Sequence, residues 1–137
     1  MKKLNIAFIC VHNSCRSQMA EAITRHLYND MFNVFSAGTH KKDKINQDAV
    51  KTISSIYAVD MNESQYPKTL NELPDVDIVI TMGCGVECPF LKSSYVEDWG
   101  LDDPTGKPLD AYIETAKQIE EKLLSITHKI KTHLITI

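Results

Sequence analysis

Residues 4–17 of the chain read LNIAFICVHNSCRS, an apolar run that gives way to a short polar loop. The run, residues 4–9, shows no clean alternation of apolar and polar side chains, which is typical of a strand buried on both faces of a parallel sheet. Beyond the loop, apolar side chains recur at helical spacing, so we expect a helix over residues 17–28. A thiol, Cys10, therefore stands at the end of a strand, in front of a helix.

This loop has the features of an oxyanion-binding nucleophile site. Backbone N–H groups between a strand and a helix converge on one point, where the helix N-terminus adds its partial positive charge. Such a field holds a tetrahedral oxyanion and stabilises the thiolate of Cys10. Arg16, one of two arginines against thirteen lysines, offers a planar grip that an ammonium lacks. The residues expected to bind the oxyanion are Val11, His12, Asn13, Ser14, Cys15, Arg16 and Ser17.

The composition is that of an ordinary globular protein. The chain has 137 residues, 43% of them hydrophobic and 24% charged, so we expect one domain over residues 1–137 with its own core. A net charge of −3 argues against nucleic acid or a membrane surface as partner. The N-terminal run lacks a cleavage site for a signal peptide. We expect a cytoplasmic monomer whose four cysteines serve catalysis, redox chemistry or metal binding.

The alternation of strands and helices predicts an α/β fold. Further strands are expected at residues 33–36, 76–82 and 94–99, and further helices at residues 47–56 and from about 109 to about 131. Right-handed crossovers then make a three-layer sandwich, a four-stranded parallel sheet of order 2-1-3-4 with helices on both faces. The first and third strands flank the point where such sheets bind ligands. Cys10 and Cys84 follow those two strands, so we expect both thiols at one crevice.

Three segments carry a resemblance to a known family: residues 10–22, CVHNSCRSQMAEA; residues 36–39, SAGT; and residues 99–107, WGLDDPTGK. They resemble the arsenate reductases built on the low-molecular-weight tyrosine phosphatase fold. With Cys84 and Cys88, the likeness covers nearly the whole chain. The run SQMAE and the cysteine pair are typical of the reductases rather than the phosphatases. The resemblance implies reduction of arsenate to arsenite, a detoxification reaction, with phosphate and sulfate as competing oxyanions.

The resemblance also implies a role for each catalytic residue. Cys10 attacks arsenic, Arg16 holds the oxyanion, and Asp103 protonates the leaving oxygen. Cys84 then attacks the Cys10 sulfur, and Cys88 moves the disulfide to the Cys84–Cys88 pair. Thioredoxin reduces that disulfide, with a small thiol as the alternative reductant, and no bound cofactor is implied. From the residues alone, the segment around Asp103 is better explained as a turn.

Other loop residues have smaller expected roles. By the family pattern, Asn13 braces the loop and Ser17 stabilises the Cys10 thiolate, although either is also an ordinary capping residue. We expect Cys15 to pack between sheet and helix, and His12 to be a loop residue rather than a catalytic base.

Some members of the family bind potassium near this loop. Asn13, Glu21 and Ser36 match that site, whereas Pro67 stands in place of a further acidic ligand. We therefore expect at most weak potassium binding, and no other metal.

Three other functions stay open. A phosphatase of the same fold needs only Cys10, Arg16 and Asp103, but phosphatases place aromatic residues where Thr105 and Gly106 stand here. A zinc module would use the four cysteines, but their spacing is not that of zinc knuckles and Arg16 would lie beside the cation. A redox switch would oxidise reversibly without turning over an oxyanion.

Overall fold

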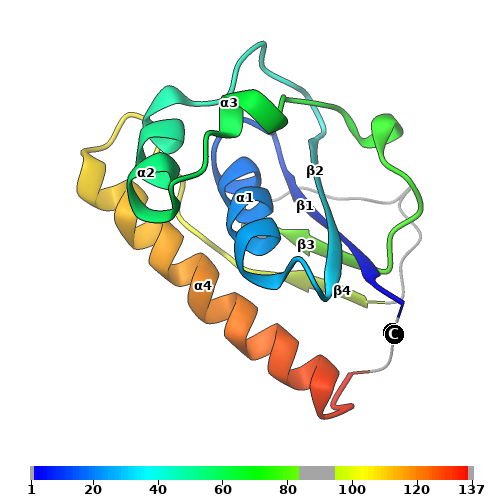
Figure 1. Cartoon of the computed structure of the whole chain (residues 1–137). Coiled ribbons are helices and arrows are strands. Elements are labelled where there is room, and N and C mark those ends of the chain that lie inside the picture. The colour runs from blue at the N-terminus through cyan, green and yellow to red at the C-terminus, as the bar shows by residue number, and fades with distance from the viewer. Residues whose placement is uncertain (1, 84–94, 136–137) are drawn as a thin grey trace.

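The computed structural model describes residues 2–83 and 95–135, and four parallel strands in that part of the chain form one sheet (Figure 1). The strands are β1 (Leu4–Cys10), β2 (Phe32–Gly38), β3 (Ile78–Thr81) and β4 (Tyr95–Asp98). Their order, β2-β1-β3-β4, is the predicted one. β1 runs one residue further than expected, so Cys10 is its last residue and pairs with Gly38 at the end of β2.

The helices are α1 (Arg16–Tyr28), α2 (Gln47–Tyr57), α3 (Met61–Ser64) and α4 (Leu109–Lys131), with a 3-10 helix, η1 (Leu70–Glu72). The apolar spacing predicted α1, α2 and α4 to within a residue at each end. It missed α3 and η1, because elements this short have no periodic pattern. None of the helices in the described part of the chain has the length and apolarity needed to cross a membrane.

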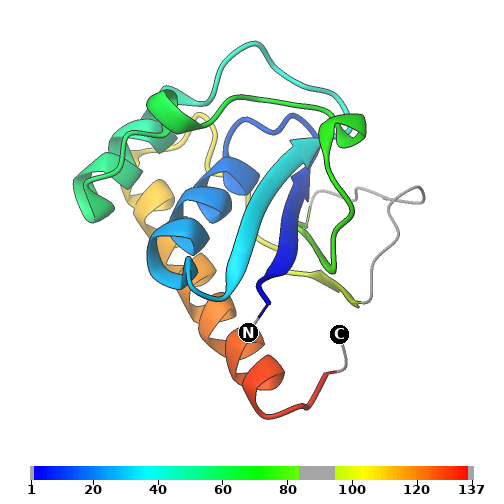
Figure 2. The same cartoon turned by 45° about the vertical axis from the view of Figure 1, so that its right-hand side comes forward.

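The two central strands of the sheet, β1 and β3, are largely buried on both faces. Figure 2 shows α1, α2 and α4 together on one side of it. Alternate residues of β1 face the two sides: Ile6 and Phe8 belong to the large core under these helices, whereas Ala7 and Ile9 belong to a smaller cluster against which Leu70 of η1 packs. This burial on both faces explains why the strand reads as a continuous apolar run.

The chain's single tryptophan packs the segment after β4 against the sheet. Trp99 is 3% exposed, and its ring packs against Phe8 with the centroids 5.4 Å apart. Its Nε1 donates to Glu97 Oε2 at 2.7 Å, and its backbone N–H donates to the carbonyl of Thr81 at 2.8 Å. The segment that leads to Asp103 is therefore held at the C-terminal ends of the strands.

Candidate active site

A pocket with a volume of about 190 Å³ opens where β1 gives way to α1. Three segments that are distant in sequence build it: the loop before α1, the loop after β2 and the segment after β4. Its lining residues are Cys10, Val11, His12, Ser14, Cys15, Arg16, Lys42, Asp103 and Thr105. At ~30 Å³ per water molecule, the pocket has room for one tetrahedral oxyanion with a few waters.

The structure thus brings three of the five predicted catalytic residues together: Cys10, Arg16 and Asp103. The other two, Cys84 and Cys88, lie outside the described residues. The last described residue before them, Gly83, follows β3 with a positive φ of 87°. A Cβ at Gly83 would lie 2.5 Å from the Cα of Gly100. The chain can therefore leave β3 at this point only with a glycine.

The Cys10 thiol is hydrogen-bonded to a buried serine. Its Sγ lies 2.8 Å from Ser17 Oγ, and both residues are buried. Ser17 Oγ accepts from Asn13 Nδ2 at 2.9 Å, so the serine's own hydrogen is free to point at the sulfur. A hydroxyl that donates to sulfur favours the charged thiolate over the neutral thiol. The contact supports a role for Ser17 in stabilising the Cys10 thiolate, and that role stays a prediction.

The side chain of Asn13 is fixed in one orientation by its partners. Its Oδ1 accepts from the backbone N–H of Lys68 at 2.9 Å and from Gln18 Nε2 at 3.0 Å. Since both partners are donors, the amide NH₂ must face the other way, toward Ser17 and Ser36. Asn13 has a φ of 50°, a left-handed conformation that asparagine tolerates better than most residues. It lies fully buried behind the pocket and braces the loop from inside.

Arg16 lies at the start of α1 and is only 8% exposed. Its Nη1 donates to the carbonyl of Met82 at 2.8 Å and to that of Leu101 at 2.6 Å. Its Nη2 lies 4.0 Å from Asp103 Oδ2. One nitrogen of the guanidinium therefore holds two backbone segments, which leaves the other facing the pocket. Lysine, with a single nitrogen, could not do both.

The first turn of α1 also favours an anion. Within α1, all of which is described, this turn has no acidic residue, and the side chain of the preceding Cys15 makes no capping hydrogen bond. The N–H groups and the partial positive charge of the helix end are therefore available to a bound oxyanion.

Asp103 lies on the opposite side of the pocket, half exposed. Its Oδ1 accepts from the Thr105 backbone N–H at 3.0 Å and from Thr105 Oγ1 at 2.7 Å. Burial, the largest single influence, raises the pKa of Asp103, but the Thr105 hydrogen bonds and the charges of Arg16 and Lys42 outweigh it, so the pKa lies below its usual value. Asp103 is therefore a carboxylate in the ligand-free pocket at neutral pH.

Cys15 belongs to the helix-side core, as expected, and is 6% exposed. Burial, together with the negative charge of Asp103, raises the pKa of the Cys15 thiol to about 12. The Cys15 thiol, which lies in the same loop as Cys10, is therefore protonated at neutral pH.

We predict that Cys15 resists alkylation in the native protein. A pKa of about 12 instead of 9.0 lowers the thiolate fraction at neutral pH by roughly 10³-fold. Peptide mapping after treatment with iodoacetamide should find Cys15 unmodified in buffer and modified in guanidinium chloride. Modification of Cys15 in buffer at the rate of an unfolded peptide would show that burial does not protect the thiol or raise its pKa.

The loop after β2 supports the candidate anion-binding loop through backbone hydrogen bonds. The N–H groups of His40, Lys42 and Asn46 donate to the carbonyls of Val11, His12 and Ser14 at 2.8, 3.1 and 2.8 Å. These two loops approach each other at Gly38, where a Cβ would lie 2.7 Å from the carbonyl oxygen of Val11. Gly38, the glycine of the SAGT segment, is therefore required because a side chain would collide with the neighbouring loop.

The sequence did not single out Lys42 or the buried pair Gln18 and Gln65. The lysine-rich residues 41–44 after β2 indicate a positive charge near the pocket. They do not indicate which of these lysines lines it. Gln65 Nε2 donates to Gln18 Oε1 at 2.7 Å, and Gln18 Nε2 donates to Asn13. Side-chain amides so far apart in sequence give no pattern that would predict this contact.

The residues that match a potassium site also come together. Asn13 Nδ2 donates to Ser36 Oγ at 3.0 Å, and Ser36 Oγ donates to Glu21 Oε1 at 2.5 Å. Within residues 2–83 and 95–135, no three His, Cys, Asp or Glu side chains form a cluster that could hold a metal ion.

The sequence pattern of the low molecular weight phosphotyrosine protein phosphatases matches residues 5–134. The chain belongs to this family. Arsenate reductase 1 of Staphylococcus epidermidis is 34% identical to it over 134 residues, which cover 95% of this chain and 100% of that relative. A full-length relative of this chain is thus an arsenate reductase.

Two solved structures show the same likeness. An arsenate reductase in the phosphate binding state has a TM-score of 0.83 at 30% identity, covering 94% of this chain and 99% of that chain. The thioredoxin-dependent arsenate reductase of Corynebacterium glutamicum has a TM-score of 0.72 at 31% identity, covering 93% of this chain and 63% of that chain. The resemblance to the arsenate reductases of the phosphotyrosine phosphatase family is thereby confirmed.

Proposed function

We propose that this protein reduces arsenate to arsenite, with Cys10 as the nucleophile. The observation that carries the proposal is the pocket itself, in which the Cys10 thiol, hydrogen-bonded to Ser17, faces Arg16 and Asp103. Two relatives, at 34% and 31% identity, are arsenate reductases, which supports arsenate as the oxyanion.

The first step forms a bond between sulfur and arsenic. The loop N–H groups and Arg16 bind arsenate, and the Cys10 thiolate attacks arsenic(V). One oxygen leaves as water after it receives a proton through Asp103. The product is a covalent arseno-cysteine, with arsenic still in the +5 state.

The second step is the reduction. The Cys84 thiolate attacks the sulfur of Cys10, a disulfide forms, and the electron pair of the sulfur–arsenic bond goes to arsenic, which leaves as arsenite. Cys88 then attacks Cys84, so the disulfide moves to the Cys84–Cys88 pair and Cys10 is free again. Two thiols have lost the two electrons that arsenic gained.

A dithiol protein of the thioredoxin class is the proposed reductant for the Cys84–Cys88 disulfide. The thioredoxin-dependent relative from C. glutamicum supports this choice. A small thiol that attacks the arseno-cysteine would instead bypass Cys84 and Cys88.

The decisive experiment follows arsenate-dependent oxidation of NADPH with thioredoxin and thioredoxin reductase, and maps disulfides after one turnover. We expect turnover and a Cys84–Cys88 disulfide. The Cys88→Ser variant should complete a single turnover and stall, and Cys84→Ser should stop at the arseno-cysteine. Normal turnover by Cys88→Ser with thioredoxin would exclude this relay.

Phosphomonoester hydrolysis is the second candidate, because Cys10, Arg16 and Asp103 are sufficient for it and the family includes phosphatases. In that case Cys10 forms a phosphocysteine that water hydrolyses. An aryl phosphate assay distinguishes the two: rapid hydrolysis with no arsenate turnover would place the chain among the phosphatases. We expect only slow hydrolysis beside full arsenate reduction.

Asp103→Ala should slow formation of the arseno-cysteine by roughly 10²-fold at neutral pH. Because the lowered pKa leaves Asp103 ionised in the ligand-free pocket, the proton it passes on must arrive with the oxyanion. The wild-type rate should therefore fall as the pH rises and protonated arsenate becomes scarcer, and the variant should show a weaker slope. Rapid-quench kinetics at several pH values give the rate of arseno-cysteine formation and its dependence on pH for both proteins. An unchanged rate would remove Asp103 from the acid role.

A further inference from the structure

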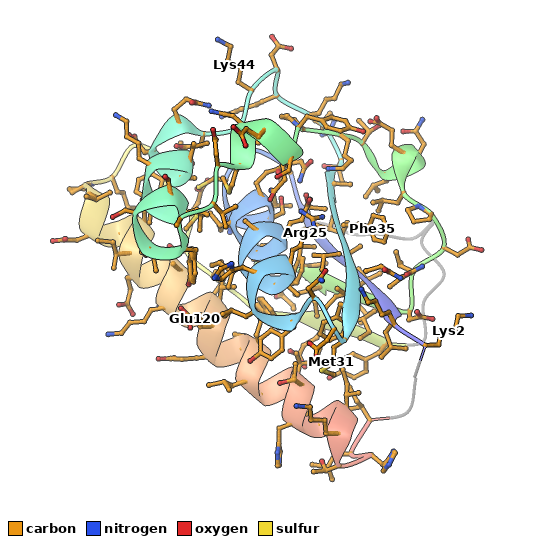
Figure 3. All side chains as sticks on the ribbon, in the orientation of Figure 1. Lys2, Arg25, Met31, Phe35, Lys44 and Glu120 are labelled. Carbon is orange, nitrogen blue, oxygen red and sulfur yellow. The ribbon has the colours of Figure 1, made fainter. Side chains whose placement is uncertain are left out.

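Glu21 is a buried carboxylate behind the pocket that the proposed mechanism does not use. It lies on α1 and is 3% exposed. Its Oε2 accepts from Arg25 Nη2 at 2.8 Å, and its Oε1 lies 3.6 Å from Lys68 Nζ. Arg25 reaches from α1 toward β2 (Figure 3), where its Nη2 also donates to the Val34 carbonyl. This buried charge is therefore matched by two cations of the chain itself.

The Lys68 ammonium is held as a bound cation would be. Its side chain is 12% exposed. Besides Glu21, Nζ contacts the carbonyl oxygen of Tyr66 at 3.1 Å and lies 4.9 Å from the centre of the Tyr66 ring. A carboxylate, a carbonyl and an aromatic face together replace the water that an ammonium loses on burial.

A potassium ion does not fit the residues that match the family's site. The Asn13 side-chain oxygen already faces two N–H donors, from Lys68 and Gln18. Ser36 Oγ accepts from Asn13 and donates to Glu21. The remaining oxygen ligands, those of Glu21, face Arg25 and Lys68. This geometry therefore argues against a potassium ion at Asn13, Glu21 and Ser36, where the sequence predicted at most weak binding.

We propose that the Lys68 ammonium takes the place of a monovalent cation behind the pocket, so that the protein holds its nucleophile loop without potassium. The inference rests on the proposed role of Cys10, and makes Lys68 a positioning residue. It acts through contacts and does not touch the substrate.

A continuous chain of polar contacts joins Lys68 to the candidate nucleophile. It runs from Lys68 Nζ to Glu21, Ser36, Asn13, Ser17 and Cys10. Each link sets the direction of the next: Ser36 donates to Glu21, so Asn13 can donate to Ser36 and to Ser17, and Ser17 donates to the sulfur. The Lys68 ammonium neutralises the Glu21 carboxylate, which is the acceptor at the start of this chain of hydrogen bonds.

The first test needs no variant. Thermal unfolding of the wild type, and the rate at which iodoacetamide modifies Cys10, are measured in potassium chloride and in choline chloride of equal concentration. We expect the same Tm and the same rate in both salts. A clear gain in Tm or rate with potassium would overturn the proposal, because it would mean that the ion still has a site. Neither readout requires arsenate turnover, so a failed proposed function leaves this result interpretable.

The second test removes the ammonium and offers an ion in its place. In choline chloride, Lys68→Ala should lose roughly 5 °C in Tm and react at Cys10 roughly tenfold more slowly, as expected for a lost hydrogen bond to a charged group. Potassium chloride should restore most of both losses in this variant alone. Lys68→Arg should resemble the wild type. Lys51→Ala, at an exposed lysine of α2, is the matched control and should change neither value.

The possible failures have distinct meanings. If Lys68→Ala equals the wild type in both salts, Lys68 does not position the loop. If both losses occur and potassium restores neither, the side chain supports the fold by packing, and the ammonium does not stand in for an ion. Either result contradicts the proposal.

Discussion

Cys10→Ser should abolish both arsenate reduction and aryl phosphate hydrolysis, by roughly 10⁵-fold or more. A serine hydroxyl is a far weaker nucleophile at neutral pH than a cysteine thiolate. The oxygen also cannot form the disulfide through which two electrons pass to arsenic. Because Cys10 is buried and its side-chain contact with Ser17 can be kept by a hydroxyl, the fold should be unaffected.

The measurement is steady-state kinetics with both substrates, accompanied by circular dichroism and thermal unfolding. Cys15→Ala is the matched control, since it removes the other buried thiol of the same loop, and it should keep most of the activity. Residual activity of Cys10→Ser within tenfold of the wild type would mean that another group attacks the oxyanion.

Arg16→Lys should lower kcat/KM for arsenate by roughly 10²–10³-fold, although the positive charge is kept. The guanidinium does two things at once. Its Nη1 donates to the buried carbonyls of Met82 and Leu101, while Nη2 faces Asp103 across the pocket. The single nitrogen of a lysine cannot reach both the two carbonyls and the oxyanion.

The same substitution should lower the free energy of unfolding by about 2 kcal/mol, since at least one buried carbonyl loses its donor. Phosphate binding by titration calorimetry, together with urea unfolding, separates the loss of anion affinity from the loss of stability. Arg25→Lys, at the chain's other arginine, is the control and should leave kcat/KM nearly unchanged. Equal phosphate affinity in Arg16→Lys and the wild type would contradict the assigned contact.

Much of the fold could be predicted because its signals are local. The apolar run of β1 and the long amphipathic stripe of α4 set strand and helix directly, and the right-handed crossover rule then orders the sheet. The positions of Cys10 and Arg16 followed from the same local reading, since one ends a strand and the other begins a helix.

The remaining site residues depend on contacts between segments far apart in sequence. Asp103 looked like part of a turn, and only the family resemblance suggested a place for it in the site. Lys42 and Lys68 are two of thirteen lysines, and nothing near them in sequence shows that one lines the pocket and the other is buried against Glu21. A buried ion pair is a property of packed elements, so it becomes visible only in three dimensions.

Trp99 gives the protein an internal optical reporter. The ring that packs on Phe8 belongs to the same short segment that supplies the Leu101 carbonyl and the Asp103 carboxylate. Because this is the chain's only tryptophan, its emission wavelength during refolding reports when that segment leaves water and docks against the sheet. Activity and a blue-shifted emission should therefore return with the same time constant, even if helical circular dichroism recovers earlier.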